Sequence, residues 1–477
     1  MNMEYETVIG FEVHIELNTK TKIFCGCSSA FGAEPNTNVC PVCTGMPGTL
    51  PVLNKKVVEK AIAAGLALNC NINDVCIFDR KNYFYPDNPQ NYQISQLYAP
   101  ICRDGYVEIE TGGGVKRIRI HEIHMEEDAG KLLHDEEANC SYIDYNRSGV
   151  PLIEIVSEPD IRSAEEAIAY LEHIKTAAQY ADISDCRMQE GSMRADLNIS
   201  VRKKSEKKFG TRCEIKNLNS FRSVSRAIEF EAERQIKIIE SGGTVVQETR
   251  HWDEKRSETY SSRSKEDAKD YRYFPEPDIP PVHISGEWVH KIWETLPEFR
   301  SDKIKRYISG FELPEYDAKL ITQSKRLADL FEETVRLGAA PKKVSNWIMG
   351  ELLRLLKENK EEPEDIRFTA DSLYSLIKLV EDGIINNTVA KTVFGKMYLL
   401  NIEPVSFVEE NGLKTVNDET ALMEAVIKII KDNPKAVQEY KEGKEKVLGF
   451  LVGQVMKETK GKAAPDLVRE LLKKELT

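Results

Sequence analysis

The sequence predicts an α+β protein, with strands and two long helices in its amino-terminal part and helices alone in its carboxy-terminal part. Up to about residue 290, runs of alternating apolar and polar residues are separated by turn signals. From there to Thr477, apolar residues recur at helical spacing. A length of 477 residues suggests about three domains, and 41% hydrophobic with 30% charged residues is ordinary for a folded globular chain.

The elements of the amino-terminal part are expected in the following order. Residues Ile9–Leu17 alternate apolar and polar side chains, as in a strand with one buried face. The glycines at 112–114 lie between two alternating runs and predict a hairpin turn. Ser163, followed three residues later by Glu166, predicts the capping box of a first helix. A second helix is expected at about 223–240.

The remaining chain is expected to begin with a linker and to continue as helices. Four prolines within Pro275–Pro281 predict irregular structure. The amphipathic helices beyond it should break near Pro341, Pro363 and Pro404. The chain should end with a pair of helices at about 444–459 and 465–476. The expected domains are residues 1–292, 293–405 and 406–477.

Composition and charge exclude several classes of protein. A net charge of −12 disfavours a protein that coats nucleic acid through its overall charge. No run of some 18 uncharged apolar residues predicts a membrane span. The acidic first residues carry no export signal, so a cytoplasmic protein without membrane contact is expected. The balance inverts locally, because ten basic residues stand against six acidic ones between Lys435 and Lys474.

Four of the ten cysteines are clustered, as Cys25-x-Cys27 and Cys40-x-x-Cys43 with twelve residues between the two pairs. Four thiolates at such spacing can close a tetrahedral site around Zn²⁺. A site with four protein ligands has no open position for substrate, so a structural zinc is expected. The alternative is a set of four unrelated buried thiols.

Acidic side chains from several predicted strands point to a Mg²⁺ site. Alternation places Glu12, His14 and Glu16 on the polar face of the first strand. The other candidates are Glu154 within an apolar run, Glu126, Glu127 and Asp128 with His124 after a strand, and Arg194 and Asp196 on a further alternating strand. Oxygen and imidazole donors suit a divalent ion. The alternative for each acid is a solvated or salt-bridged side chain.

A Mg²⁺ site indicates phosphate chemistry, because this ion commonly pairs with substrate phosphates. The basic residues that could clamp phosphate oxygens are Arg80, Lys81, Arg147, Arg194 and Arg272. No P-loop, kinase glycine-rich loop or dinucleotide-binding fingerprint is present. The residues alone therefore predict a metal- and phosphate-handling protein outside the common ATP-binding folds.

Ordered motifs along almost the whole chain carry a resemblance to a known family. They are Glu12–Leu17, Phe78–Asp87, Tyr92–Gln96, His124–Lys131, Asp144–Arg147, Pro151–Asp160, Glu214–Ser220, Glu248–Arg250 and Asp270–Asp278. In these segments the chain closely resembles the B subunits of bacterial glutamyl/aspartyl-tRNA amidotransferases. One segment departs from the frequent family pattern: Gln90 stands where a lysine often follows proline.

The resemblance implies a mixed-sheet, cradle-shaped kinase domain, a helical domain and a small helical tail. It implies that ATP phosphorylates the side-chain carboxylate of a mischarged Glu-tRNA(Gln) or Asp-tRNA(Asn). Ammonia from an amidase-type A subunit then displaces the phosphate, and a small C subunit holds the other two together. It implies Glu12, His14, Glu127 and Glu154 as leading Mg²⁺ ligands, with Glu126 and Asp196 close behind, and tRNA contact, but no DNA contact, through Lys444, Lys446, Lys457, Lys460 and Lys462.

Two other functions remain open from the sequence. One is a non-catalytic, zinc-stabilised scaffold that binds tRNA and whose acidic faces are merely solvated. The other is a glutamine-dependent ligase for a small molecule, which would need its own glutaminase nucleophile. No Cys–His arrangement in the sequence supplies one.

Overall fold

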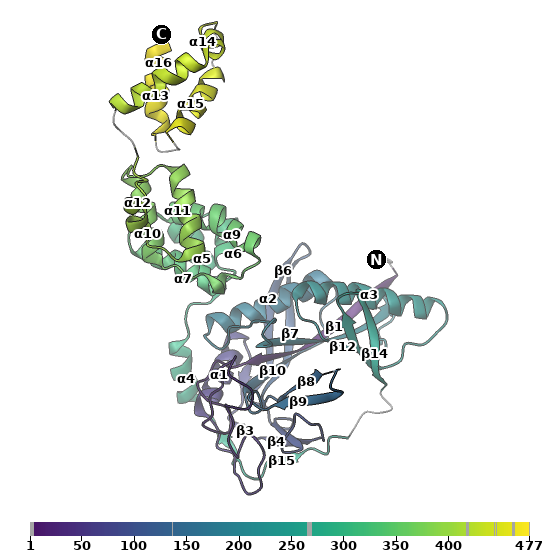
Figure 1. The fold of residues 1–477 in the computed structure, drawn as a ribbon. Helices are drawn as coiled ribbons and strands as arrows, with labels where there is room; N and C mark the ends of the chain where they lie inside the picture. The colour runs from purple at the N-terminus through teal and green to yellow at the C-terminus, as the bar shows by residue number, and fades with distance from the viewer. Residues whose placement is uncertain are drawn as a thin grey trace. The chain divides into compact units, whose positions relative to one another are not determined.

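A computed structural model describes residues 4–135, 137–264, 270–415, 419–442, 444, 446–459 and 463–476. The chain divides into two compact units, Met1–Phe299 and Arg300–Thr477 (Figure 1). This division falls seven residues after the expected boundary at 292. That boundary lies inside helix α4 (Gly286–Thr295), whose Ile292 is buried in the core of the first unit. The three expected domain ranges remain a prediction.

The first unit is built on a nine-stranded sheet. Its order is β14-β13-β12-β11-β1-β10-β7-β6-β2, and smaller sheets flank it. The strands are β1 (Tyr5–Glu16), β2 (Asn71–Ile72), β3 (Val75–Cys76), β4 (Asp79–Asn82), β5 (Tyr92–Ser95), β6 (Cys102–Thr111), β7 (Gly114–Glu127), β8 (Lys131–Asp135), β9 (Cys140–Asp144), β10 (Pro151–Ser157), β11 (Met193–Lys203), β12 (Cys213–Lys216), β13 (Glu248–Asp253), β14 (Glu258–Ser264), β15 (Phe274–Pro275) and β16 (Val282–His283). The large sheet is mixed because β12 and β13 run parallel, whereas its other neighbouring strands are antiparallel.

Helices cover one face of this sheet and leave the other for polar side chains. The helices of the unit are α1 (Lys55–Ala67), α2 (Ala164–Tyr180), α3 (Phe221–Glu240) and α4. Figure 1 shows α2 and α3 along one face. Phe11 of β1 stacks on Tyr170 of α2 with ring centroids 6.0 Å apart. Because strand side chains alternate, the intervening polar residues of β1 project from the face away from these helices.

Both long helices of the first unit confirm the prediction, with a variation at their starts. The Ser163 hydroxyl accepts a hydrogen bond from the backbone N–H of Glu166, as expected for the cap of α2. The Glu166 carboxylate accepts instead from the backbone N–H of Arg162, so the reciprocal half of the capping box is displaced by one residue. Helix α3 begins slightly before the predicted residue 223, with Ser220 as its cap.

The turn at 112–114 is confirmed, because β6 and β7 pair antiparallel and Thr111 is opposite Gly114. The prediction that Pro275–Pro281 links two units was wrong. Pro275 pairs with Asp79, and Val282, just beyond the segment, pairs with Cys76, so both ends of the segment return to the first unit. Prolines exclude long ladders but allow short edge pairings.

The second unit consists of helices. They are α5 (Arg300–Phe311), α6 (Glu315–Ile321), α7 (Lys325–Arg336), α8 (Pro341–Trp347), the π-helix η2 (Ile348–Leu352), α9 (Leu353–Asn359), the 3₁₀ helix η3 (Pro363–Asp365), α10 (Ala370–Glu381), α11 (Asn387–Leu400), α12 (Pro404–Glu410), α13 (Glu419–Asp432), α14 (Pro434–Lys441), α15 (Lys446–Glu458) and α16 (Pro465–Leu476). Pro341, Pro363 and Pro404 each begin an element, because the first helical position needs no N–H donor.

Two separate hydrophobic clusters stabilise this second unit. One spans Tyr307 to Val408 and the other spans Leu422 to Leu476. The expected final helix pair agrees with α15 and α16. In the described parts of the chain, every helix is too short or too polar to cross a bilayer.

Candidate functional site: two acidic groups on the open face of the sheet

Strand register brings four polar side chains into one row across the centre of the sheet. His14 of β1 is opposite Arg194 of β11 on one side and Glu154 of β10 on the other. Glu154 is in turn opposite His124 of β7. Paired residues project from the same face, so the row lies on the face away from α2 and α3.

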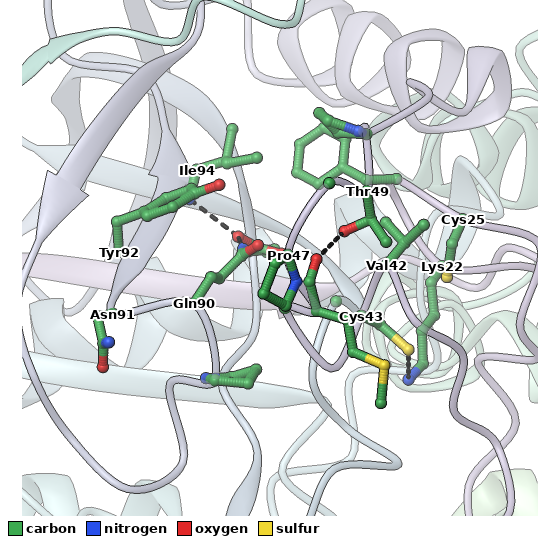
Figure 2. A pocket seen from close by; sticks show the side chains of 18 residues that line it. Lys22, Cys25, Val42, Cys43, Pro47, Thr49, Gln90, Asn91, Tyr92 and Ile94 are labelled. Carbon is green, nitrogen blue, oxygen red and sulfur yellow. Dashed lines mark hydrogen bonds between the residues drawn. The ribbon is translucent and has the colours of Figure 1, made fainter.

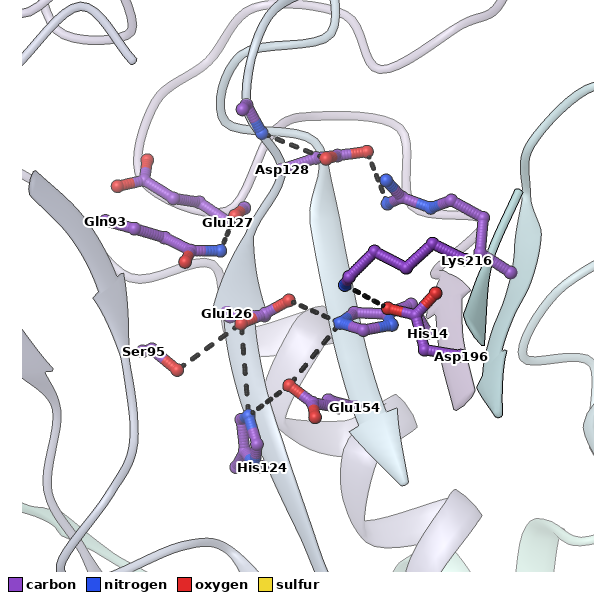
Figure 3. A network of polar contacts seen from close by, with 12 residues as sticks. His14, Gln93, Ser95, His124, Glu126, Glu127, Asp128, Glu154, Asp196 and Lys216 are labelled. Carbon is purple, nitrogen blue, oxygen red and sulfur yellow. Dashed lines mark hydrogen bonds and ion pairs between the residues drawn. The ribbon is translucent and has the colours of Figure 1, made fainter. Parts of the chain in front are cut away.

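The first acidic group consists of His14, Glu126 and Glu154 (Figure 3). The His14 Nε2 lies 3.5 Å from a Glu126 oxygen and 3.4 Å from a Glu154 oxygen. Burial alone would lower the pKa of His14, but its hydrogen bond and attraction to Glu154, and then attraction to Glu126, raise it to about 9. Their possible ligand atoms lie within 4.8 Å of one another, a spacing that fits a shared cation.

His124 extends this group on the β7 side. Its Nε2 lies 3.0 Å from a Glu154 oxygen. Burial raises the pKa of Glu154, but attraction and hydrogen bonding to His124 and then His14 hold it well below its usual value. The Glu154 carboxylate is therefore ionised between two imidazoles. A cation bound here would have to displace a proton from His14 in order to use its nitrogen.

The second acidic group consists of Glu12, Asp196 and Glu214, from neighbouring strands β1, β11 and β12. The Lys216 ammonium donates to Asp196 at 2.6 Å (Figure 3) and lies 3.0 Å from a Glu214 oxygen. Burial, followed by repulsion from Glu154, raises the pKa of Glu12. The ligand atoms of this group also lie within 4.8 Å of one another.

Glu127 belongs to neither group, because it follows Glu126 directly and points to the opposite face of β7. Its carboxylate accepts from the Gln90 side chain at 2.6 Å and from the Ile94 backbone at 3.0 Å. Burial is the main cause that raises the pKa of Glu127 to about 8. Its expected role as a Mg²⁺ ligand remains a prediction.

Two of the expected phosphate-binding arginines lie at the end of the acidic row. Arg194 donates to Asp128 at 2.7 Å, and Arg147 lies 3.5 Å from the same carboxylate oxygen. Arg147 also donates to the backbone oxygens of Ala129 and Gly130, at 3.0 and 2.7 Å. Both arginines are therefore held next to the first group by partners within the chain.

The other expected phosphate-binding residues lie on or beside the small sheet of β15, β4 and β5. Arg80 is occupied by Glu276, through two of its nitrogens, and by Asp278 at 3.0 Å. The Lys81 ammonium lies 4.9 Å from the centre of the Tyr271 ring. Arg272 is exposed, and its backbone has a positive φ of 47°.

The cysteine quartet is brought together, with its four sulfur atoms within 4.8 Å of one another. The Cys40 and Cys43 sulfurs are 3.9 Å apart, close to the spacing of about 3.8 Å that follows from tetrahedral Zn–S bonds of about 2.3 Å. A hydrogen bond from Cys25 is the largest cause that lowers the pKa of Cys43 to about 4. Four clustered sulfurs therefore fit a thiolate-bound metal.

The quartet borders a cavity of about 270 Å³ (Figure 2). Cys25, Cys43 and Lys22 line it on one side, and Gln90 and Glu127 line it as well. Pro89, Tyr92 and Ile94 complete the wall that approaches β7. Two cysteines of the quartet and Glu127 thus line one cavity.

The expected tRNA-binding lysines are only partly described. Lys444, Lys446 and Lys457 are exposed, and Lys444 lies 3.8 Å from a Glu439 oxygen. Lys460 and Lys462 lie outside the described residues. The proposed contact with tRNA remains a prediction.

Sequence reasoning missed Glu214 and Lys216 as members of the second group. Glu214 and Lys216 share one face of β12, a strand of only four residues. The available signal in the sequence was the alternation of the polar Glu214 and Lys216 with the apolar Ile215 between them. It becomes informative only when β12 is known to pair with β11.

Comparison with known proteins assigns this architecture to a class. A family model described as the GatB/GatE catalytic domain matches residues 7–290, which include both acidic groups and the cysteine quartet. A second model, described as the GatB domain, matches residues 329–476 of the helical unit.

Similarity to full-length relatives is more specific. The B subunit of the aspartyl/glutamyl-tRNA(Asn/Gln) amidotransferase of Agathobacter rectalis is 61% identical over 468 residues, covering 98% of each chain. Proteins of the same name are 58% identical in Lachnospira eligens, covering 99% of each chain, and 57% identical in Caldanaerobacter subterraneus, covering 100% of each chain. The chain belongs to the family of B subunits of aspartyl/glutamyl-tRNA(Asn/Gln) amidotransferases, which are components of a ligase complex.

Proposed function

We propose that this chain activates the side-chain carboxylate of Glu-tRNA(Gln) or Asp-tRNA(Asn) by ATP-dependent phosphorylation, in a cradle-shaped kinase domain. The observation that carries the proposal is the pair of acidic groups on the open face of the sheet, one at His14 and the other at Glu12. Phosphoryl transfer needs little covalent chemistry from a protein and depends on positioning and charge stabilisation. The family assignment supports the choice of substrate.

The residues of the two groups would have distinct tasks. His14, Glu126 and Glu154 offer one imidazole and two carboxylates to a first Mg²⁺, and Glu12, Asp196 and Glu214 offer three carboxylates to a second. When bound, Mg²⁺ supplies neutralisation of the phosphate oxygens. Arg194 and Arg147 lie next to the first group, where they would orient phosphate oxygens by hydrogen bonds after exchange of their Asp128 contact. We further propose that Glu127, which points to the opposite face of β7, takes part in Mg²⁺ binding from that side.

The activated carboxylate requires a source of nitrogen and a complex that holds the tRNA. We propose that ammonia comes from glutamine hydrolysed by an amidase-type A subunit, that a small C subunit joins this chain to it, and that the complex works in the cytoplasm. The exposed Lys444, Lys446 and Lys457 would contact the tRNA backbone. A structural Zn²⁺ is proposed for the cysteine quartet.

The proposal is tested with the purified complex, Glu-tRNA(Gln) and Asp-tRNA(Asn), ATP, Mg²⁺ and ammonium chloride in place of glutamine. Glu154→Gln and Glu12→Gln should each lower ATP-dependent amidation at least about 100-fold, while tRNA binding persists. Glu108→Gln is the matched control, because the exposed Glu108 of β6 pairs with Arg117, away from both groups, and its loss should leave the rate unchanged. Retained activity in both site variants would refute the proposed role of these carboxylates.

A second candidate function is a non-catalytic, zinc-stabilised scaffold that binds tRNA. It is favoured by one observation: Lys216, His14 and His124 already lie against the carboxylates of the two groups. This candidate predicts that no combination of tRNA and partner subunits supports ATP hydrolysis that depends on Glu154. The same assay with labelled ATP separates the two functions.

A further inference from the structure

Lys22 is a lysine without solvent contact, because its relative exposure is 0%. Its ammonium donates to the Cys43 sulfur at 3.4 Å (Figure 2) and to the Tyr145 backbone oxygen at 3.2 Å. Within the described part of the chain, no carboxylate oxygen lies within 4.0 Å of this ammonium. The nearest candidate for a negative charge is therefore the sulfur of Cys43.

A buried ammonium without a counter-charge costs several kcal/mol. Lys303, another buried lysine, illustrates the ordinary solution: it is 7% exposed and lies 2.6 Å from a Glu332 oxygen. Lys22 has only a sulfur and a carbonyl in that role. The cysteine quartet must therefore be negatively charged when Lys22 is buried as an ammonium ion.

A divalent metal with four thiolates carries a net charge of −2, and this charge must also be accommodated. One lysine reduces it to −1, and N–H···S hydrogen bonds spread the remainder. The Cys40 backbone N–H already donates to the Cys43 sulfur at 3.2 Å. Lys22 and the quartet thus compensate each other: each removes the main electrostatic cost of burying the other.

We propose that Lys22 is the counter-ion that holds a divalent, thiolate-preferring metal ion in the cysteine quartet, acting through its contact with Cys43. This role goes beyond the proposed phosphorylation and does not depend on it. Lys22 is a positioning residue, since it touches a ligand rather than the metal.

The same side chain connects the quartet to the segment that borders the acidic row. The Tyr145 carbonyl accepts from Lys22, and the Ser148 hydroxyl donates to the Cys43 backbone oxygen at 2.9 Å. The Gly149 N–H then donates to the backbone oxygen of Asp128 at 2.9 Å. Metal loading would therefore also fix the segment that supports Asp128.

The test measures metal affinity of the full chain by competition with a chromophoric chelator. Lys22→Met, which keeps most of the length of the side chain without its charge, should weaken Zn²⁺ and Co²⁺ binding at least about tenfold, as loss of other outer contacts to metal ligands does. The sulfur-to-cobalt charge-transfer band should also move to lower energy, because the Cys43 thiolate loses a hydrogen-bond donor. Unchanged affinity together with an unchanged band would overturn the proposal.

Two controls separate this role from general destabilisation. Lys303→Met removes a buried lysine from the other unit and should leave metal affinity and the cobalt spectrum as in the unsubstituted chain. Lys22→Arg retains the charge and should restore most of the affinity lost in Lys22→Met. A Lys22→Arg protein that is folded but binds metal as weakly as Lys22→Met would contradict a counter-ion role.

A measurement on the unsubstituted chain covers the case in which Lys22→Met does not fold. Reductive methylation followed by mass spectrometry should label Lys22 weakly in the metal-loaded chain. After removal of the metal, its labelling should rise toward that of Lys55, whose side chain is 75% exposed. Equal labelling of Lys22 in both states would overturn the proposal.

Discussion

The ammonium of Lys216 is the positive charge that lies against the carboxylates of the second acidic group. Burial would raise the pKa of Glu214, but attraction to Lys216 outweighs it and lowers that pKa. Attraction to Asp196 and Glu214 likewise raises the pKa of Lys216 against the effect of burial. The Lys216 ammonium offsets the repulsion among the carboxylates of this group, to which Glu12 adds a third.

Replacing Lys216 with methionine should therefore destabilise the first unit in a pH-dependent way. We expect a loss of about 1–2 kcal/mol at pH 7, discounted from a fully buried pair because the lysine side chain keeps 40% exposure. The loss should shrink at pH 3, because the pKa of Glu214 is lowered in the folded chain and its contribution to stability is lost only as the pH falls through that value. Urea unfolding at both pH values measures it, with Lys116→Met as the control for loss of a single-carboxylate pair. An equal loss at both pH values would contradict this account.

Glu127 predicts the opposite kind of pH dependence. Its folded-state pKa is raised from 4.5 to about 8, so the stability associated with its protonated form is complete below pH 4.5 and disappears as the pH rises through 8. Glu127→Gln keeps a neutral acceptor for Gln90 and Ile94 and avoids ionisation. Relative to the unsubstituted chain, it should gain on the order of 4 kcal/mol between pH 5 and pH 9. Unfolding free energies in Mg²⁺-free buffer test this, and a constant difference would refute it.

At the scale of residues, alternation predicted the polar face of β1 correctly, but His124, Glu126 and Glu127 were expected after a strand and instead lie within β7. Glu126 and Glu127 are adjacent in one strand, so they could not both face the same cluster. Glu214 escaped because a four-residue strand has too little periodicity to be recognised. Arg80 lies in the small sheet as a partner of Glu276, a contact across almost 200 residues that no local pattern contains.

At the scale of elements, the start of α2 depends on one hydroxyl. The Ser163 oxygen accepts from the Glu166 N–H at 3.1 Å, while the Glu166 carboxylate pairs with Lys116 of β7 at 2.7 Å. Glu166 thus connects the capped first turn of the helix to the sheet that the helix covers. Ser163→Ala should cost about 1 kcal/mol of stability, measured by urea unfolding. The exposed Ser205→Ala is the neutral control, and no difference between the two variants would argue against the cap.

Elements defined by local signals were predictable, whereas those defined by distant partners were not. The hairpin at Gly112, the cap at Ser163 and the prolines that begin α8 and α12 each depend on a few consecutive residues. The proline-rich segment at 275–281 has the composition of a linker, and its composition does not reveal that β3 and β4 pair with its ends. Short edge pairings are set by the tertiary structure.

At the scale of the whole molecule, the two compact units have separate cores, and the cysteine quartet belongs to the first. We expect differential scanning calorimetry to resolve more than one unfolding transition. Removal of metal by a chelator should lower the transition of the first unit and leave that of the second in place, because ligand binding stabilises only the unit that holds it. Cys43→Ser should reproduce this pattern without a chelator. An equal shift of all transitions would contradict it.

The overall class followed from two kinds of periodicity, but the order of the strands did not. Neighbours in the sheet come from positions as distant in sequence as β1, β10 and β11, and only this order makes the first acidic group. The separate sequence segments supplied the right residue types. Their convergence rests on pairings between strands far apart in the chain.

The central place of β1 has a consequence for how this chain tolerates change. Insertion or deletion of a single residue between Ile9 and Glu12 would turn every later side chain of the strand to the other face, placing Val13 (insertion) or Ile15 (deletion) on the open face where His14 lies. Both acidic groups take a member from this strand, so one such change would disable them together. Length polymorphism should accordingly be confined to loops, and a fusion tag at the amino terminus belongs before Tyr5.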